Sequence, residues 1–168
     1  QYGSRGASGV IVVTTVKGKN GVKTLSYNGT YGVSNVYKNL DMLSAAQYRA
    51  TAQKLGMSPN DLGHSTNWFD EIEQLGYTQN HNLSFGAGNE DSNYRASVGL
   101  IDQQGIIKNS GMRNYTAKLD AMQTMFDNKL KIEFGMFGSL KEVDYTNDYE
   151  KTFYSAASYN PTFPTTVN

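Results

Sequence analysis

The sequence predicts an all-β fold, in which about five antiparallel strands form part of a transmembrane β-barrel and one short helix lies in a long loop. Apolar and polar residues alternate with a period of two in several segments, the pattern of strands that have one apolar and one polar face. Short and long connections also alternate, as they do in membrane barrels. No apolar run approaches the ~18–20 residues of a membrane-spanning helix, which excludes a helical membrane protein.

Composition narrows the class of protein further. The 168 residues include 15 basic and 15 acidic side chains, so no charge excess points to a nucleic-acid partner. Cysteine is absent, which excludes disulfides and thiolate metal sites. The 12 tyrosines and 7 phenylalanines suit strands and interfacial girdles, and they suit a soluble β-sandwich equally.

The chain opens with a glycine-rich turn that leads into a buried strand. Gly3, Gly6 and Gly9 recur at every third position around Arg5 and allow close backbone approach. The β-branched run Val10–Val16 favours an extended backbone with packed neighbours. We expect a buried strand there, ending in water at Lys17 and Lys19.

Five alternating segments follow, and each predicts a strand with one apolar face. Their apolar positions are Leu25, Tyr27, Gly29, Tyr31 and Val33; Leu83, Phe85 and Ala87; Tyr94, Ala96, Val98 and Leu100; Tyr115, Ala117, Leu119 and Ala121; and Leu130, Ile132, Phe134 and Met136. The connections between them are predicted as long (35–77), short (88–92), longer (102–111) and short (127–128), with a loop from 143 onward.

The first long loop carries the expected helix. Ser44 or Asp41 can cap a short helix that runs through Leu55 and ends at Gly56 and Pro59. An aromatic and acidic cluster follows at 68–72, and we expect it to precede the next strand.

The opening segment YGSRGASGVIVVTTVKGK resembles the end of the plug domain in TonB-dependent outer-membrane transporters of the SusC/RagA type. In that family a pattern close to YG-x-RG-A-x-GVI-x-x-TTKKGK leads into the first barrel strand, and Val16 stands here where a lysine is usual. The segment HNLSFGAGNEDSNYRASVGLIDQQGIIKNSG is similar to the second and third strands. The resemblance covers almost the whole chain to about Lys141.

This resemblance implies an organisation and a function. Residues 1–20 would end a plug domain, with Gly3, Arg5, Gly6 and Gly9 packing it against the barrel, and residues 21–168 would open a much larger barrel in the bacterial outer membrane, among its lipids. It implies energised import of oligosaccharides or oligopeptides, with a SusD-like surface lipoprotein as lid and the TonB–ExbB–ExbD motor as energy source. No chemistry on the substrate is implied.

Aromatic residues in the first loop are the candidate ligand contacts. Tyr37, Trp68 and Phe69 could stack on sugar rings or peptides, or could simply pack the loop. On the lumen side we expect a ladder of charges that holds the plug, formed by Arg95, Lys118, Asp120, Lys131 and Glu133.

Enzymatic and metal sites have little support in the sequence. His64 and His81 lie in different elements with no carboxylate at ligand spacing, and no Ser/His/Asp grouping is legible. We therefore expect no catalytic, cofactor or metal site. Asp144, Asn147, Asp148 and Glu150 gather oxygen ligands that could hold calcium, although a solvated loop is the simpler interpretation.

A soluble extracellular β-sandwich, serving as a binding or adhesion module, is the alternative. In that fold Leu25, Phe85, Tyr94 and Phe134 would face a protein core between two sheets. The direction of the apolar faces separates the two: outward for a barrel wall, inward for a sandwich.

Overall fold

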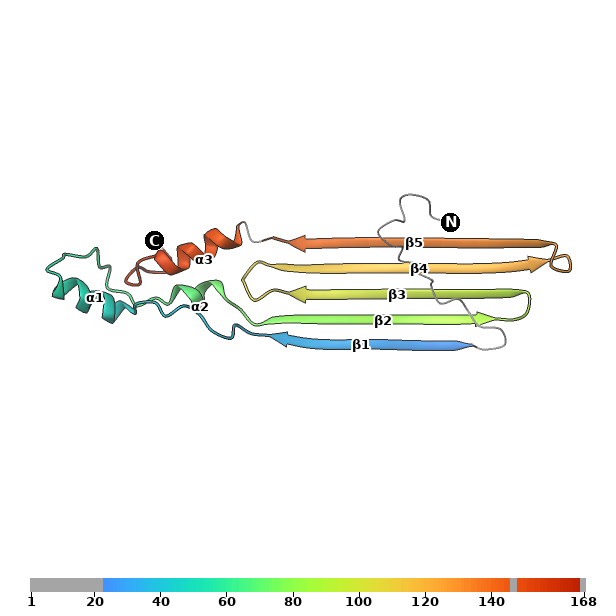
Figure 1. Ribbon diagram of the computed structural model, residues 1–168, viewed down its shortest axis with the longest axis horizontal. Coiled ribbons are helices and arrows are strands. Elements are labelled where there is room, and N and C mark those ends of the chain that lie inside the picture. The colour runs from blue at the N-terminus through green and yellow to red at the C-terminus, as the bar shows by residue number, and fades with distance from the viewer. Residues whose placement is uncertain (1–22, 146–147, 167–168) are drawn as a thin grey trace, which may run out of the picture. The chain divides into compact units, whose positions relative to one another are not determined.

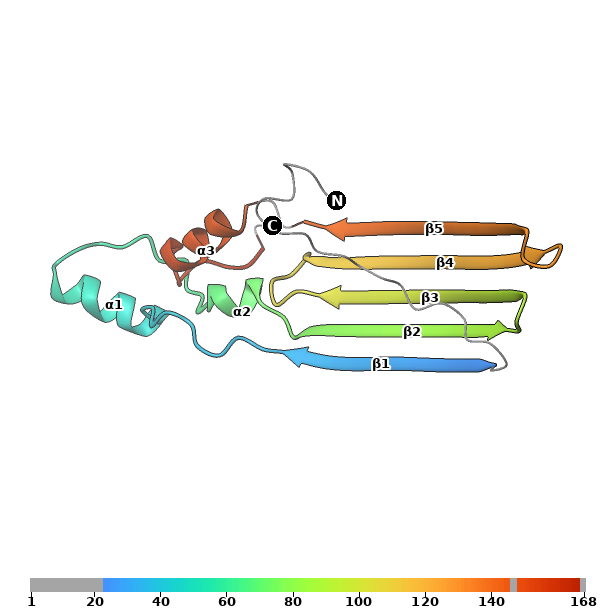
Figure 2. The same cartoon turned by 45° about the vertical axis from the view of Figure 1, so that its right-hand side comes forward.

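The computed structural model describes residues 23–145 and 148–166, and within them five strands form one antiparallel sheet (Figure 1). The strands lie in chain order and are β1 (Thr24–Ser34), β2 (Gly76–Gly88), β3 (Ser92–Gln104), β4 (Gly111–Met125) and β5 (Leu130–Asp144). A view turned by 45° shows the same order (Figure 2). β1 and β5 are the two edges of the described sheet.

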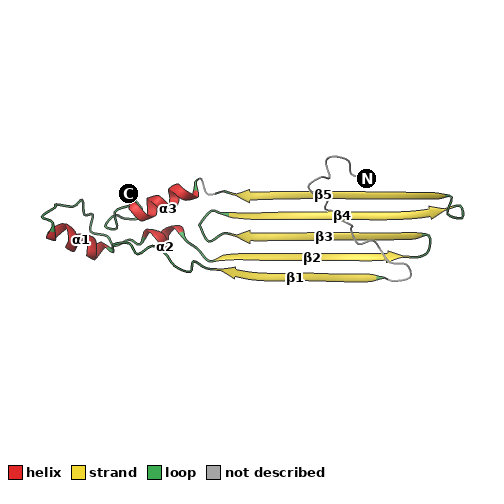
Figure 3. Ribbon diagram, viewed as in Figure 1, coloured by secondary structure: helices red, strands yellow, loops and turns green. Residues whose placement is uncertain are grey.

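Three helices belong to the connections rather than to the sheet (Figure 3), counted over the described residues. They are α1 (Ala45–Lys54) and α2 (Trp68–Ile72), both between β1 and β2, and α3 (Tyr149–Ser158), which follows β5. The expectation of one short helix is therefore wrong. Among the described residues, no helix has the length and apolarity needed to cross a membrane.

The apolar face of the strands is open. Leu25 is 72% exposed, and Phe85, Tyr94 and Phe134 are 45%, 44% and 54% exposed. The β-sandwich alternative placed these four side chains in a protein core, and their exposure in a single sheet contradicts it.

The opposite face is polar and its side chains bond across strands. The hydroxyls of Ser26 and Ser84 share a hydrogen bond of 2.7 Å, and Arg95 Nη2 donates to Ser84 Oγ at 3.2 Å. The expected charged residues also pair along this face. The ion pairs are Lys118–Asp120 and Lys131–Glu133, each at 3.0 Å.

The short turns have the backbone that their residues favour. Asn89 Oδ1 accepts hydrogen bonds from the backbone of Asp91 and Ser92 between β2 and β3. Between β4 and β5, Phe126, Asp127 and Asn128 all have positive φ, of 55°, 52° and 67°. Asp and Asn tolerate this conformation, whereas it is strained for phenylalanine.

One boundary differs from the expectation. β2 begins at Gly76, next to the predicted end of the long connection at residue 77, whereas the connection between β3 and β4 shortens from 102–111 to 105–110. The segment Tyr77–Asn82 lacks apolar alternation, so its periodicity gives no strand signal, but backbone pairing with β3 does not require apolar side chains.

The structure divides into two units. The described part of one comprises residues 23–27, 83–98 and 116–138, which are strand segments and the two short turns. The described part of the other comprises residues 28–82, 99–115, 139–145 and 148–166, and it includes the helices α1, α2 and α3. The expected plug strand, Val10–Val16, with Gly3, Arg5, Gly6 and Gly9, lies outside the described residues.

Candidate functional site

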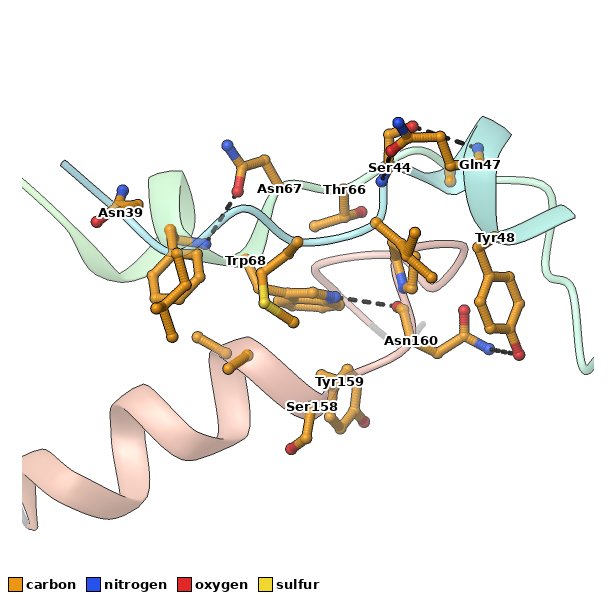
Figure 4. A pocket seen from close by; sticks show the side chains of 18 of the residues that line it. Asn39, Ser44, Gln47, Tyr48, Thr66, Asn67, Trp68, Ser158, Tyr159 and Asn160 are labelled. Carbon is orange, nitrogen blue, oxygen red and sulfur yellow. Dashed lines mark hydrogen bonds between the residues drawn. The ribbon is translucent and has the colours of Figure 1, made fainter. Parts of the chain in front are cut away.

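The candidate site is an open cavity of about 860 Å³ in the unit that contains the helices (Figure 4). Ligand sites commonly enclose about 300–1,000 Å³. Three chain segments line it, within residues 39–48, 65–69 and 156–161. Two come from the loop between β1 and β2, and the third follows β5.

The first wall is the start of α1, which is fixed by a capping box. Ser44 Oγ accepts from the backbone N–H of Gln47 at 3.3 Å, and Gln47 Oε1 accepts from the backbone N–H of Ser44 at 2.9 Å. The helix ends before Gly56, whose φ of 66° suits glycine. Of the two predicted caps, Ser44 and not Asp41 begins the helix, and the predicted stop at Gly56 is confirmed.

The second wall is α2, a single short turn of helix that begins on a side-chain cap. Asn67 Oδ1 accepts from the backbone N–H of Phe69 at 3.2 Å, and acidic residues in the first turn favour the positive end of the helix dipole. Phe69 is only 4% exposed and packs near Phe153 of α3, with ring centroids 6.3 Å apart. By packing against α3, the buried Phe69 therefore helps to fix α2, which forms this wall of the cavity.

Trp68 is the aromatic residue of the cavity whose position is most fully determined. Its indole N–H donates to the backbone carbonyl of Asn160 at 3.0 Å. Its ring meets Tyr159 edge to face, with centroids 4.9 Å apart, and Tyr159 meets Phe163 in the same manner at 5.8 Å. One hydrogen bond and one ring contact thus fix the plane of the indole.

An ion pair holds the loop that connects α1 to α2. Arg49 contacts Asp61 through two hydrogen bonds, of 2.6 and 2.8 Å, and donates a third to the carbonyl of His64. The Arg49 hydrogen bond, followed by that from the backbone N–H of Gly63, lowers the pKa of Asp61 to about 2. This carboxylate is ionised throughout the physiological range.

The lining chemistry favours a neutral ligand. The side chains are mainly amides, hydroxyls, aliphatic groups and the aromatic rings of Tyr48, Trp68 and Tyr159, and Asp41 is the single charged residue of the lining. Such groups bind by hydrogen bonding and stacking. In the described part of the chain, no cluster of three His, Asp or Glu residues could hold a metal ion.

The predicted contact residues are only partly brought together. Trp68 and Phe69 line the cavity, whereas Tyr37 is fully exposed and is not among the lining residues. In the segment 144–150, where calcium was the less favoured interpretation, Asp148 caps α3 by accepting from the backbone N–H of Lys151 at 3.0 Å. Asn147 lies outside the described residues.

Sequence reasoning missed the residues that follow β5. Tyr159 and Asn160 complete the cavity, yet the segment was expected to be loop. A signal for α3 was present, since Asp148 stands where a helix cap would and Glu150 follows in the first turn. No local pattern could have indicated that Asn160 meets Trp68.

Comparison with known proteins identifies curated relatives along most of the chain. The chain is 36% identical to the TonB-dependent receptor SusC of Bacteroides thetaiotaomicron over 99% of the chain's own length. It is 31% identical to the TonB-dependent receptor P3 of Formosa agariphila over 90% of the chain's own length. The chain spans only 17% and 15% of the length of these two relatives. No family model matches the sequence.

Solved structures share the fold. The chain matches the RagAB peptide transporter with a TM-score of 0.72 over 96% of this chain and 23% of that one, at 20% identity. It matches the RagAB peptide importer in its closed-closed state with a TM-score of 0.68, over 88% of this chain and 21% of that one, at 21% identity. The five-stranded open sheet thus corresponds to part of a much larger barrel.

Proposed function

The chain is homologous to part of the SusC/RagA-type TonB-dependent receptors, which are outer-membrane β-barrel proteins, and on this premise we propose that it forms wall and outer loops of an importer. The cargo is an oligosaccharide or an oligopeptide nutrient. The barrel is the membrane component of a SusCD-like complex, and a SusD-like lipoprotein covers its mouth. The family is non-enzymatic, so the mechanism is gating.

One observation carries this proposal. The described sheet has an apolar face that is open along its strands and a polar face that is linked by hydrogen bonds and ion pairs. A soluble protein would bury such an apolar face, whereas lipid accepts it. The polar face then lines the lumen, where Lys118, Asp120, Lys131 and Glu133 meet the plug.

The energy source follows from the same premise. The TonB–ExbB–ExbD motor of the inner membrane pulls on the plug, which residues 1–20 help to form, with Gly3, Arg5, Gly6 and Gly9 packed against the barrel. Ligand is captured between the lid and the loops before the plug moves. In the loops, Trp68 and Tyr37 contact the cargo, and the buried Phe69 packs near Phe153 of α3.

Growth of a deletion strain tests the proposal. The strain lacks the full-length receptor and receives, one at a time, neutral oligosaccharides or a tryptic digest of casein as the sole carbon source. We expect growth on at least one probe to require the receptor gene and an intact TonB. Equal growth of parent, receptor-deletion and TonB-deletion strains on every probe would refute import by this receptor.

A further inference from the structure

Asn160 lies at the centre of the hydrogen bonds that join two loops distant in sequence (Figure 4). Its Nδ2 donates to the carbonyl of Asn60 at 2.7 Å and, more weakly, to Tyr48 Oη at 3.5 Å. Its Oδ1 accepts from the backbone N–H and the hydroxyl of Thr162, at 2.9 and 2.8 Å. The amide group thus uses both its donor and its acceptor capacity.

The segment 160–163 is also paired with the first loop through its backbone. The N–H of Thr66 donates to the carbonyl of Pro161 at 2.9 Å, and the N–H of His64 donates to the carbonyl of Thr162 at 3.1 Å. Thr66 Oγ1 donates to the carbonyl of Phe163 at 2.6 Å. Thr162 is completely buried in this joint.

The contacts of segment 160–163 with the first loop extend to Trp68, one of the aromatic residues that line the cavity. The backbone carbonyl of Asn160 accepts the indole N–H of Trp68, and the neighbouring Tyr159 packs edge-on against the same ring. The side chain of Asn160 therefore holds the segment that in turn holds Trp68. An aspartate would keep the acceptor but lose the donor to Asn60, and an alanine would lose both.

We propose that Asn160 is a positioning residue for Trp68. Its side chain joins segment 160–163 to residues 60–66, an arrangement that we call the latch, so that both loops present one preorganised surface. The inference rests on the proposed function only for the statement that Trp68 meets cargo. A surface ordered before binding loses less conformational entropy when a ligand arrives.

Hydrogen exchange on the full-length receptor in detergent tests the latch directly. We expect the amides of His64 and Thr66 to be protected in the native receptor. In Asn160→Ala they should exchange about tenfold faster or more, because the buried Thr162 loses its side-chain acceptor and the carbonyl of Asn60 loses its donor. Asn160→Asp should be intermediate. Ser158→Ala is the matched control, since Ser158 Oγ bonds to the carbonyl of Tyr154 in its own helix.

Two results would overturn the latch: no protection of His64 and Thr66 in the native receptor, or unchanged protection in a folded Asn160→Ala or Asn160→Asp variant. The first result would overturn the latch even if no variant folds. Exchange is measured without cargo, so a receptor that imports none of the probes would refute the proposed function and leave the latch intact.

Discussion

Trp68 and Asn160, 92 residues apart in sequence, are joined by a hydrogen bond of 3.0 Å from the indole N–H to a backbone carbonyl. The bond links the loop between β1 and β2 to the segment after β5. It explains why a partly buried indole is stable here, because a tryptophan N–H away from water needs an acceptor.

Two replacements of Trp68 distinguish the contribution of its hydrogen bond from that of its aromatic ring. Trp68→Phe keeps an aromatic face but removes the donor to Asn160, whereas Trp68→Ala removes both. We expect Trp68→Ala to reduce uptake of the growth-supporting probe about tenfold or more, at ~1–3 kcal/mol for a lost aromatic contact, and Trp68→Phe to reduce it less. The measurement is initial uptake rate against probe concentration, and equal rates for both variants and the native receptor would exclude Trp68 as a contact.

The Arg49–Asp61 pair predicts a stability change only in acid. Because the folded state lowers the pKa of Asp61 to about 2, below the ~3.9 of an unfolded chain, the pair stabilises the loop above that range. Its contribution is lost as the pH falls from about 4 towards 2. Digestion by pepsin should therefore cleave residues 55–66 faster at pH 2 than at pH 4.

Asp61→Asn provides the control for this effect. The variant lacks the titrating carboxylate, so its loop should be cleaved readily already at pH 4, with a smaller further increase at pH 2. If the cleavage rate rose by the same factor from pH 4 to pH 2 in the native receptor and in Asp61→Asn, the acid effect would come from groups other than Asp61.

Two phenylalanines of β5 test which face meets lipid. Phe134 and Phe137 are separated by an odd number of positions, so they lie on opposite faces, and both are exposed, at 54% and 66%. Phe134→Arg should destabilise the barrel by ~2–4 kcal/mol if it lies near the middle of the bilayer, and Phe137→Arg by much less. The readout is the fraction of receptor that resists unfolding in cold detergent gels.

The comparison of Phe134→Arg with Phe137→Arg decides which face of β5 meets lipid. Equal losses for both arginine variants would mean that neither face is specific for lipid. A larger loss for Phe137→Arg would reverse the assignment of the faces.

Phe69 is buried and Tyr37 is exposed, so truncation to alanine should destabilise the fold at Phe69 but not at Tyr37. Phe69→Ala opens a void beside Phe153 and should destabilise the helical unit by about 3–5 kcal/mol, seen as faster trypsin cleavage of the loop in the full-length receptor. Tyr37→Ala should leave that cleavage unchanged, because the side chain is fully exposed. Rapid cleavage of Tyr37→Ala, or none in Phe69→Ala, would contradict these roles.

The sequence was most informative where the physical constraint is local. Alternation identifies a strand wherever one face must be apolar, as in Leu130–Met136, and the Ser44 and Gly56 signals locate α1 because capping is a short-range interaction. It gave no signal for Tyr77–Asn82, since a paired but polar strand has no periodicity.

The helix α2 and the cavity were beyond such reasoning for a different reason. A helix of 5 residues is too short for a periodic signal and is stabilised by the burial of Phe69 against another segment. The contacts of Asn160 likewise depend on chain segments about 100 residues apart. Their identification required the folded arrangement.

The open margins of the sheet have a consequence for biogenesis. Within the described sheet, β1 and β5 each present outward-pointing amide groups that no neighbouring strand covers. Hydrocarbon penalises each of these groups by several kcal/mol, so the segment cannot enter the bilayer on its own. For the proposed membrane role, insertion therefore requires further strands to pair with both margins.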